Sequence, residues 1–390
     1  MKIFDSLHNK FTRQEKSKYL LIVATISLIS IGLLFVYSAS YYTAQNNTGN
    51  KFFYFTKQSI GAIVGFVCMF FCSKLSKKFL NKMAIPLAIV SAVLLVLVLI
   101  PGIGVENYGA RRWIGIGSFT FQPSEIAKFA LVLFVAFFVC RPTYDAKKFK
   151  NLLPILAVGG VYCALIILEP NMSITVCVGL VLVVLLLMAG TKIKHFVLIL
   201  LPLVGAIPLL IFAEPYRIQR LLAFLDPWAN PKDEGYQLIQ SLYALGSGGW
   251  FGVGLFNSRQ KYSFLPFAES DFIFSVIGEE WGILGCLIVL SLYLVIIVCG
   301  IKIAVNSKDF FDTMLAGGIT AVIGVQSAIN FCVVTGLIPP TGLPLPFVSY
   351  GGTSLVVFSS AIGLLIGVAS RNRTFNLSIN TNNIFAYINI

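Results

Sequence analysis

The sequence predicts an all-α, polytopic membrane protein with about ten transmembrane helices. Of its 390 residues, 57% are apolar and only 12% are charged. Apolar runs of about 18 to 20 residues, long enough to cross the hydrocarbon core of a bilayer, recur along the chain. The net charge of +13 is scattered over short segments between these runs. Because a nucleic-acid-binding protein gathers such charge on one soluble face, the composition argues against nucleic acid as a partner.

Ten apolar segments are candidate membrane spans. The first is too long for a signal peptide and lacks a small-residue cleavage site, so we interpret it as a transmembrane helix. The predicted spans are residues 19–41, 59–72, 83–99, 124–140, 152–168, 173–189, 196–212, 271–300, 313–334 and 353–370. Residues 1–18 form a basic segment before this membrane domain of residues 19–370, and residues 371–390 form a polar tail after it.

The distribution of lysine and arginine predicts the orientation of the spans. With the N-terminus inside, the segments on the cytoplasmic side hold most of the 29 basic residues. The acids on that side are only Asp5, Glu15, Asp145, Asp309 and Asp312. Since cytoplasmic loops are enriched in basic residues, we expect both termini to be cytoplasmic.

Four segments are then expected on the outer side, at residues 101–122, 169–171, 213–270 and 336–352. The third is the largest loop and lies between the seventh and eighth spans. The fourth, GLIPPTGLPLPFVSYGG, has too many prolines and glycines for a continuous helix. Broken backbone at membrane depth persists only where it is buried in protein or lines a cavity, so we expect one of these surroundings for it.

The stretch at residues 252–282, GVGLFNSRQKYSFLPFAESDFIFSVIGEEWG, places many ionisable groups at one predicted water–membrane boundary. Charge in hydrocarbon is costly, so we expect a solvated cavity or ion pairs there. Asp271 either caps the helix that follows it or acts as a general base at the mouth of a cavity. Glu279 and Glu280 either pair with cations from neighbouring helices or belong to a polar pathway. The glycines at residues 246–254 are interpreted as turns or a half-buried elbow, because no nucleotide-loop motif accompanies them.

A second motif, QPSEIAK at residues 122–128, opens the fourth predicted span. Ser124 is placed to cap the helix, and Glu125 and Lys128 have the spacing of an ion pair within it. The alternative is that Lys128, a turn inside the membrane on the outer side, holds an anionic head group. Both interpretations stay open on the sequence alone.

Cations on the predicted outer side also allow two interpretations. They are Arg111, Arg112, Arg217, Arg220, Arg259 and Lys261. They either contact solvent and lipid head groups or form a phosphate or diphosphate site, for which guanidinium is well shaped. The only histidines, His8 and His195, fall in predicted cytoplasmic segments, so carboxylates must supply any acid–base chemistry outside. The eight cysteines fall in or beside apolar runs and are interpreted as small hydrophobic residues.

Taken in order, these motifs resemble the SEDS family of polytopic cell-wall polymerases, represented by FtsW, RodA and SpoVE, over residues 19–373. The sequences GEEWG and GLPLPFVSYGGTS resemble those of FtsW and SpoVE most. The motifs that carry the resemblance are RW at 112–113, FQPSEIAK at 121–128, RL at 220–221, FLDPW at 224–228, GYQ at 235–237, QS at 240–241, GSGG at 246–249, SRQK at 258–261, FLP at 264–266, DFIF at 271–274, GEE at 278–280 and PLPFVSYGG at 344–352.

The resemblance implies a peptidoglycan glycosyltransferase of the bacterial inner (plasma) membrane. Such an enzyme polymerises lipid II, the undecaprenyl-diphosphate-linked disaccharide–peptide, on the outer leaflet beside a class B penicillin-binding protein, during cell division or related wall synthesis. In that family the acid aligned with Asp271 is taken as catalytic, and residues aligned with Glu125 and Lys128 are important for activity. We therefore expect Asp271 to be the general base.

The resemblance also implies where the substrate and membrane lipids bind. The expected contacts are Arg259, Lys261, Arg220, Lys128, Glu125, Arg112 and Glu269. Cations of this kind, or a divalent metal ion such as Mg²⁺ or Mn²⁺, would stabilise the diphosphate leaving group. No organic cofactor is implied.

The sequence departs from the family pattern close to Asp271. Phe267 replaces a usual glutamate, Glu269 stands where histidine is common, and Ser270 replaces threonine. Phe256 also stands where glycine is usual. If the missing glutamate matters for metal or sugar binding, either Glu269 compensates or the activity is altered.

Two other functions remain as alternatives to the polymerase. A flippase for the lipid-linked precursor would place charges near the membrane midplane on broken helices, and Glu279 and Glu280 keep that possible. A non-catalytic scaffold would tolerate substitution of Asp271. The concentration of charge on the predicted outer side favours the polymerase.

Overall fold

The computed structural model describes residues 2–107, 110–116, 119–198, 215–229 and 235–388, together with residues 201, 205, 212 and 231. Helices account for most of this part of the chain. The elements are α1 (Lys2–Thr48), α2 (Phe53–Ser73), α3 (Lys77–Leu99), β1 (Gly104–Asn107), β2 (Ala110–Ile116), β3 (Phe119–Phe121), α4 (Pro123–Val139), α5 (Phe149–Leu168), α6 (Met172–Met188), α8 (Pro215–Leu225), α9 (Tyr236–Gly248), α10 (Ile273–Val305), α11 (Phe310–Val334) and α12 (Gly352–Ile388).

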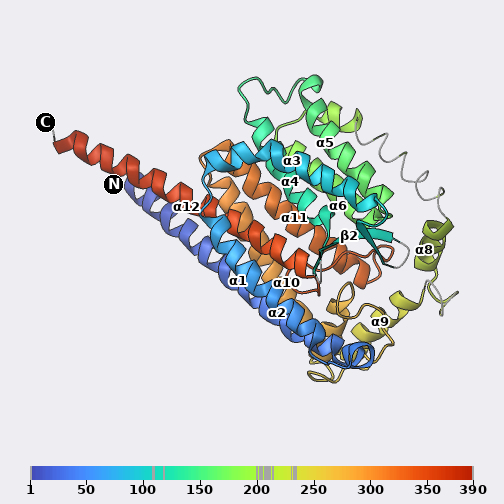
Figure 1. Cartoon of the computed structure of the whole chain (residues 1–390). Helices are drawn as coiled ribbons and strands as arrows, with labels where there is room; N and C mark the ends of the chain where they lie inside the picture. Colours follow the sequence, from blue (N-terminus) through green and yellow to red (C-terminus); the bar gives the residue numbers. More distant parts are fainter. Residues whose placement is uncertain are drawn as a thin grey trace.

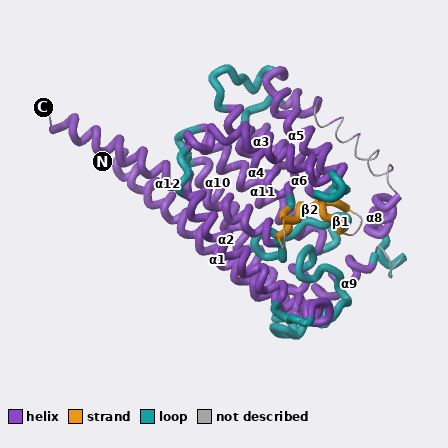
Figure 2. The backbone as a smooth tube through the Cα atoms, viewed as in Figure 1, coloured by secondary structure: helices purple, strands orange, loops and turns teal. Residues whose placement is uncertain are grey.

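The long helices lie side by side in one bundle (Figure 1). Helix α2 packs along α12, α1 along α10, and α10 along α11, while α3 packs against α4. The chain termini extend from one end of the bundle, and the strands, α8 and α9 lie towards the other (Figures 1 and 2). We call these the terminal end and the sheet end.

The predicted polytopic helical class is confirmed. Within the described residues, seven helices are long and apolar enough to cross a membrane. They are Gln14–Thr48, Phe53–Ser73, Lys77–Leu99, Phe149–Leu168, Ile273–Val305, Phe310–Val334 and Gly352–Arg371. The predicted spans at 124–140 and 173–189 correspond to the shorter helices α4 and α6, each of 17 residues. The predicted span at 196–212 lies largely outside the described residues, so the count of ten stays a prediction.

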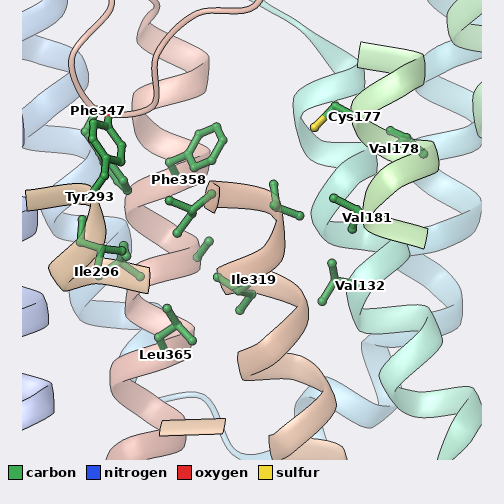
Figure 3. Close-up of a cluster of buried hydrophobic side chains, with 14 of the residues drawn as sticks. Val132, Cys177, Val178, Val181, Tyr293, Ile296, Ile319, Phe347, Phe358 and Leu365 are labelled. Atoms are coloured by element: carbon green, nitrogen blue, oxygen red, sulfur yellow. The ribbon is translucent and has the colours of Figure 1, made fainter. Parts of the chain in front are cut away.

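Two kinds of apolar surface identify the bundle interior and its outside. Buried side chains fill the space between α4, α6, α10, α11 and α12, as Val132, Val181 and Ile319 illustrate (Figure 3). On α2, by contrast, Ile63 and Phe71 are 65% and 63% exposed. Large exposed apolar patches are unusual on water-soluble proteins and are expected on a surface that faces lipid.

Ion pairs hold the helices together at the terminal end. Lys77, which opens α3, pairs with Asp309 before α11. Arg371 on α12 binds Asp312 at 2.7 Å and donates to the carbonyl oxygen of Leu75 at 2.9 Å. The sequence places all of these charged residues in cytoplasmic segments, and the structure brings them together. Which face of the membrane this end occupies stays a prediction.

The all-α prediction misses a small sheet in the loop at residues 101–122. The three strands are antiparallel in the order β1-β2-β3. Arg111 and Arg112 are neighbours on β2, so their side chains leave opposite faces. The Arg111 guanidinium pairs with Glu106 of β1 at 2.9 Å. The sheet therefore uses one arginine for its own stability and leaves Arg112 to face the rest of the protein.

Helix α10 is broken at Gly282, which the sequence analysis did not predict. Its φ and ψ of 67° and −163° are not helical. The carbonyl oxygens of Glu279 and Glu280 accept hydrogen bonds from the N–H groups of Val253 and Gly254. Beyond the break, the N–H groups of Ile283 and Leu284 donate to the carbonyl oxygens of Gly249 and Trp250. The loop at 249–254 thus satisfies backbone groups that a continuous helix would pair internally. The predicted half-buried elbow is confirmed for residues 249–254, whereas Gly246 and Gly248 lie in α9.

We expect Gly282→Ala to destabilise the protein by on the order of 2 kcal/mol or more, because a positive φ strains any L-residue. An added Cβ would also lie 2.5 Å from the Gly252 nitrogen. Gly160→Ala is a matched control, since that glycine has no positive φ and open space around its Cβ position. Thermal unfolding in detergent should show a lowered midpoint for the first variant alone; equal midpoints would contradict this account of the break.

Candidate active site

Asp271 lies just before α10 without capping it. The N-cap position is Phe272, and no side chain there accepts a helix N–H. The capping interpretation of Asp271 is therefore wrong. The helix begins at Ile273, two residues later than the predicted span, so Asp271 lies in the connecting loop.

The proline- and glycine-rich segment at residues 340–351 forms one wall beside Asp271. A Cβ added at Gly342 would lie 3.2 Å from Asp271 Oδ2. The Ser349 hydroxyl donates to the carbonyl oxygen of Ser270 at 2.5 Å. The N–H of Tyr350 donates to the carbonyl oxygen of Glu269 at 2.8 Å. This segment is packed in protein, as expected of non-helical backbone in a membrane protein.

Two buried amides on α11 fasten that wall to the Asp271 loop. Asn330 Nδ2 donates to the carbonyl oxygens of Asp271 at 2.9 Å and Leu343 at 2.8 Å. One turn earlier, Gln326 Nε2 donates to the carbonyl oxygen of Pro344 at 2.9 Å. The sequence analysis missed both residues. Their signal was present, because uncharged polar side chains one helical turn apart inside an apolar span indicate a buried polar contact.

The predicted ion pair between Glu125 and Lys128 is confirmed. Lys128 Nζ lies 2.8 Å from Glu125 Oε1, and both side chains are buried. Lys128 also donates to Gln326 Oε1, while Ser354 lies 3.3 Å from Glu125 Oε2. The predicted Ser124 cap is wrong, since α4 begins with Pro123 and has no side-chain cap. Through Gln326, this buried pair is joined to the same wall that borders Asp271.

Burial and neighbouring charge set the electrostatics of Asp271. Burial and the nearby Glu269 carboxylate raise its pKa, Arg112, a hydrogen bond from Ser270 and Arg220 lower it, and the net result is a pKa of about 6. The side chain nevertheless keeps partial solvent access. A carboxyl with a pKa of about 6 is ionised at neutral pH yet basic enough to take a proton, as a general base requires.

The predicted cationic contacts fall into two groups. Arg112 donates to the carbonyl oxygens of the α5–α6 turn, and Arg220 on α8 donates to the carbonyl oxygen of Pro340 at 3.3 Å. The charges of both act on Asp271. Arg259 is exposed, and neither it nor Lys261 is among the groups that act on Asp271. The side chain of Arg217 lies outside the part of the chain that the structure describes.

Lys261, Glu279 and Glu280 form a separate buried cluster that shapes the large loop. Lys261 Nζ lies 3.0 Å from Glu280 Oε1, and neither side chain is exposed. Ser38 on α1 donates to Glu280, and the Ser258 hydroxyl donates to Glu279. The two carboxylates also accept from the backbone N–H groups of Phe256, Ser258, Arg259 and Gln260.

This cluster decides between the two interpretations of the paired glutamates. Glu280 is paired, although its cation comes from the preceding loop and not from a neighbouring helix as expected, whereas the contacts of the Glu279 carboxylate are hydrogen bonds from the Ser258 hydroxyl and from backbone N–H groups. The position of Lys261 gives no support to a role in diphosphate binding, because its ammonium is already bound and lies inside the protein. That role stays an untested prediction.

Two of the residues that depart from the family pattern have an unusual backbone conformation. Phe256 and Phe267 have φ values of 66° and 56°, in the left-handed region that favours glycine. At Phe256 this accounts for the glycine usual in the family. The Phe256 ring packs edge-on against Tyr37 at 5.9 Å, which provides a compensating contact. Beside Asp271, Ser270 keeps the hydroxyl of threonine and uses it in a hydrogen bond to the Asp271 carboxyl.

Metal-binding groups are sparse in the described part of the chain. No group of three or more His, Cys, Asp or Glu side chains gathers there. The eight cysteines are all free, as expected. Asp271 and Glu269 do provide two neighbouring carboxylates. Magnesium commonly uses one or two carboxylates and completes its shell with water and substrate phosphate, so this pair fits that type of site.

The Lys261–Glu280 pair gives a quantitative test of the cluster. We expect Lys261→Met to destabilise the protein by about 3–5 kcal/mol, because it leaves a buried carboxylate without its cation. Adding Glu280→Gln should recover at least about 1 kcal/mol of this loss, a positive coupling in a double-mutant cycle measured by denaturant unfolding. The exposed pair of Lys148 and Asp145, 4.0 Å apart, should show a coupling below about 0.5 kcal/mol. Equal coupling for both pairs would refute a structural role for Lys261.

Comparison with known proteins adds to this geometry. The family model described as cell cycle protein, for FtsW, RodA and SpoVE, matches residues 18–374. A probable peptidoglycan glycosyltransferase FtsW from Geobacter sp. is 38% identical over 362 residues, covering 93% of this chain and 99% of that protein. Stage V sporulation protein E of Bacillus subtilis is 41% identical over 367 residues, covering 93% of this chain and 99% of that protein.

Solved structures agree with these relatives. A structure described as "Structural coordination of polymerization and crosslinking by a peptidoglycan synthase complex" superposes with a TM-score of 0.74 at 28% identity, covering 90% of this chain and 97% of that one. The rod shape determining protein RodA of Thermus thermophilus superposes with a TM-score of 0.66 at 26% identity, covering 90% and 95% of the two chains. By sequence and by fold, the chain belongs to the cell cycle protein family of FtsW, RodA and SpoVE.

Proposed function

We propose that this protein is a peptidoglycan glycosyltransferase that polymerises lipid II, with Asp271 as the general base. The observation that carries the proposal is the position of Asp271: a partly accessible carboxyl with a pKa near 6, under the influence of Arg112 and Arg220. The name of the Geobacter relative supports the reaction class, and the family description, cell cycle protein, together with the name of the Bacillus sporulation protein supports a place in cell division or related wall synthesis.

The groups fit a single displacement at a sugar carbon. Asp271 takes the proton of the acceptor hydroxyl as that oxygen forms a bond to the anomeric carbon of the donor sugar. The bond between this carbon and the diphosphate breaks, and its electron pair leaves with the diphosphate. Arg112 and Arg220 supply positive charge where this negative charge develops, which lowers the barrier. The exposed Arg259 is placed to meet substrate or lipid head groups at the surface.

The remaining predicted contacts take supporting positions in this proposal. Lys128 and Glu125 do not touch the substrate in this proposal. They help to hold the 340–351 segment in place through Gln326, which binds both Lys128 and the Pro344 carbonyl oxygen. Glu269 tunes Asp271 and offers the second carboxylate that the missing glutamate at 267 would have supplied. A divalent ion held by Glu269 and Asp271, either Mg²⁺ or Mn²⁺, would add positive charge beside the diphosphate.

The setting in the cell follows from the same proposal. The sheet end, which carries Asp271, faces outward, and both termini lie in the cytoplasm, in a multi-pass protein of the inner (plasma) membrane. The similar structure of a peptidoglycan synthase complex that combines polymerization and crosslinking supports a class B penicillin-binding protein as partner.

The break in α10 is the one observation that favours a flippase. Glu279 and Glu280 lie beside the break, as a transport site would require. Their carboxylates, however, are occupied by Lys261, by serine hydroxyls and by backbone N–H groups. A flippase would move labelled lipid II between leaflets without forming polymer, and the assay below separates the two functions.

We expect purified protein, with its partner, to form glycan polymer from lipid II, and Asp271→Asn to form none. Because Asp271 must be ionised to accept a proton, wild-type activity should fall about tenfold per pH unit below pH 6. Polymer is measured on gels over a pH series. Asp145→Asn, which changes an exposed loop aspartate, should keep the wild-type profile. Polymer formation by folded Asp271→Asn would exclude Asp271 as the base.

We expect Asn330→Leu to lower kcat by about tenfold to a hundredfold, since it frees the Asp271 loop from the 340–351 wall and small displacements of a reacting group are costly. Ser327→Ala is the matched control, because Ser327 is buried on the same helix but bonds only within it. Steady-state kinetics with lipid II would measure both. A control variant as impaired as Asn330→Leu would show that α11 matters only for folding.

A further inference from the structure

Helix α2 carries an exposed apolar stripe along the face turned away from the bundle. The face that packs against α1 and α12 holds its buried residues, Gln58, Gly61, Ala62 and Gly65. The opposite face exposes a row of apolar side chains, namely Ile60, Val64, Val67 and Phe71. We call this row the α2 stripe. Its members recur at the spacing of one helix face, and a continuous apolar row of this kind fits contact with acyl chains.

A lysine lies at each end of the α2 stripe. Lys57 precedes it near the start of the helix, and Lys74 follows the last helical residue. Lys57 Nζ lies 4.4 Å from the centroid of the Phe53 ring, and Lys74 Nζ lies 5.5 Å from that of Phe70. A helix rises about 1.5 Å per residue, so the two lysines lie roughly 25 Å apart, close to the thickness of about 30 Å of a hydrocarbon core. Both are therefore expected at the level of the lipid head groups.

A second lysine and a layer of aromatic rings distinguish the sheet end of the stripe. Lys51 Nζ lies 5.2 Å from the centroid of the Phe52 ring, just before α2 begins. The Phe52 ring stacks on Tyr37 of α1 at 5.3 Å, and Phe256 of the large loop packs edge-on against the same Tyr37 ring at 5.9 Å. These contacts hold the corner where α1 meets α2 at the sheet end of the bundle (Figure 1). We call it the α1–α2 corner.

No nearby carboxylate balances the two lysines of the α1–α2 corner. The sequence has no Asp or Glu between Glu15 and Glu106. Lys51 and Lys57 are both exposed, and within the described residues their ammonium groups contact aromatic rings and form no ion pair. At the other end of α2, by contrast, Lys77 pairs with Asp309. The corner therefore presents two uncompensated positive charges at the level where lipid phosphates lie.

We propose that the α1–α2 corner binds the phosphate of an anionic phospholipid, one acyl chain of which lies along the α2 stripe. One lipid matches both parts of this surface, because its phosphodiester meets the ammonium groups of Lys51 and Lys57 while its hydrocarbon covers the apolar row. An anionic head group is favoured over a zwitterionic one, which carries a cation of its own that the lysines repel. A partner's membrane helix would need an acid at this level, whereas a phospholipid always has a phosphate there. The proposal does not depend on the proposed function.

The test compares the binding of phosphatidylglycerol and phosphatidylcholine, with identical acyl chains, to the purified full chain in detergent by native mass spectrometry. We expect wild type to bind phosphatidylglycerol about tenfold more tightly, since each lysine near an anionic head group adds to the attraction. Lys51→Gln with Lys57→Gln should bind both lipids alike, and Lys51→Arg with Lys57→Arg should keep the preference. Lys147→Gln with Lys150→Gln is the matched control, because it removes two exposed lysines around the start of α5; it should also keep the preference.

Several outcomes would overturn the proposal. Equal binding of the two lipids by wild type would do so, as would an equal loss of preference in the control at Lys147 and Lys150. Failure of both lipids to bind would overturn it and leave the α2 face to a protein partner. Displacement of phosphatidylglycerol by an equal concentration of lipid II would assign the corner to the diphosphate of that lipid instead. None of these measurements needs polymerisation, so a failure of the proposed function would leave this test intact.

Discussion

An ionised side chain inside an apolar bundle needs a partner supplied by the protein, and this constraint shapes the whole sheet end. Glu125 meets it by pairing with Lys128, and Glu280 by pairing with Lys261. Asp271 and its neighbour Glu269 combine a raised pKa with partial access to solvent. At this site the negative charge of a carboxyl is not fully balanced by a bound cation. Carboxyls with a shifted pKa of this kind are typical of functional sites.

Non-helical backbone connects these charges. The 340–351 segment touches Asp271 on one side and receives the amides of α11 on the other, so the buried Lys128 pair reaches the site through Gln326 and Pro344. The break at Gly282 plays a similar part for the large loop, whose N–H groups bind the glutamates on α10. Both are places where a helix would have satisfied its own hydrogen bonds and could have offered none to a neighbour.

The sequence could predict the features that depend on local pattern. Apolar run length predicts the spans, and the spacing of Glu125 and Lys128 predicts their ion pair. The break at Gly282 was beyond such reasoning, because its backbone partners lie some thirty residues earlier in the chain. Asn330 was recognisable as a polar residue in an apolar helix, but its acceptors lie outside that helix, in the loop before α10 and in the segment after α11. Glu169 stands in a short turn, and only its burial beside a strand arginine marks it out.

The charge of Arg112 acts on two buried carboxyls, Glu169 and Asp271. Pairing fully with Glu169 would leave little charge for the site, and pairing fully with Asp271 would depress the pKa that a base requires. The guanidinium donates to the carbonyl oxygens of Glu169 and Pro170 in the α5–α6 turn, and its charge lowers the pKa of both carboxyls. The β2 strand makes this arrangement possible, since it turns Arg111 to Glu106 and Arg112 to the opposite face. The small sheet, absent from the predicted all-α fold, is therefore the element that fixes the charge beside the proposed base.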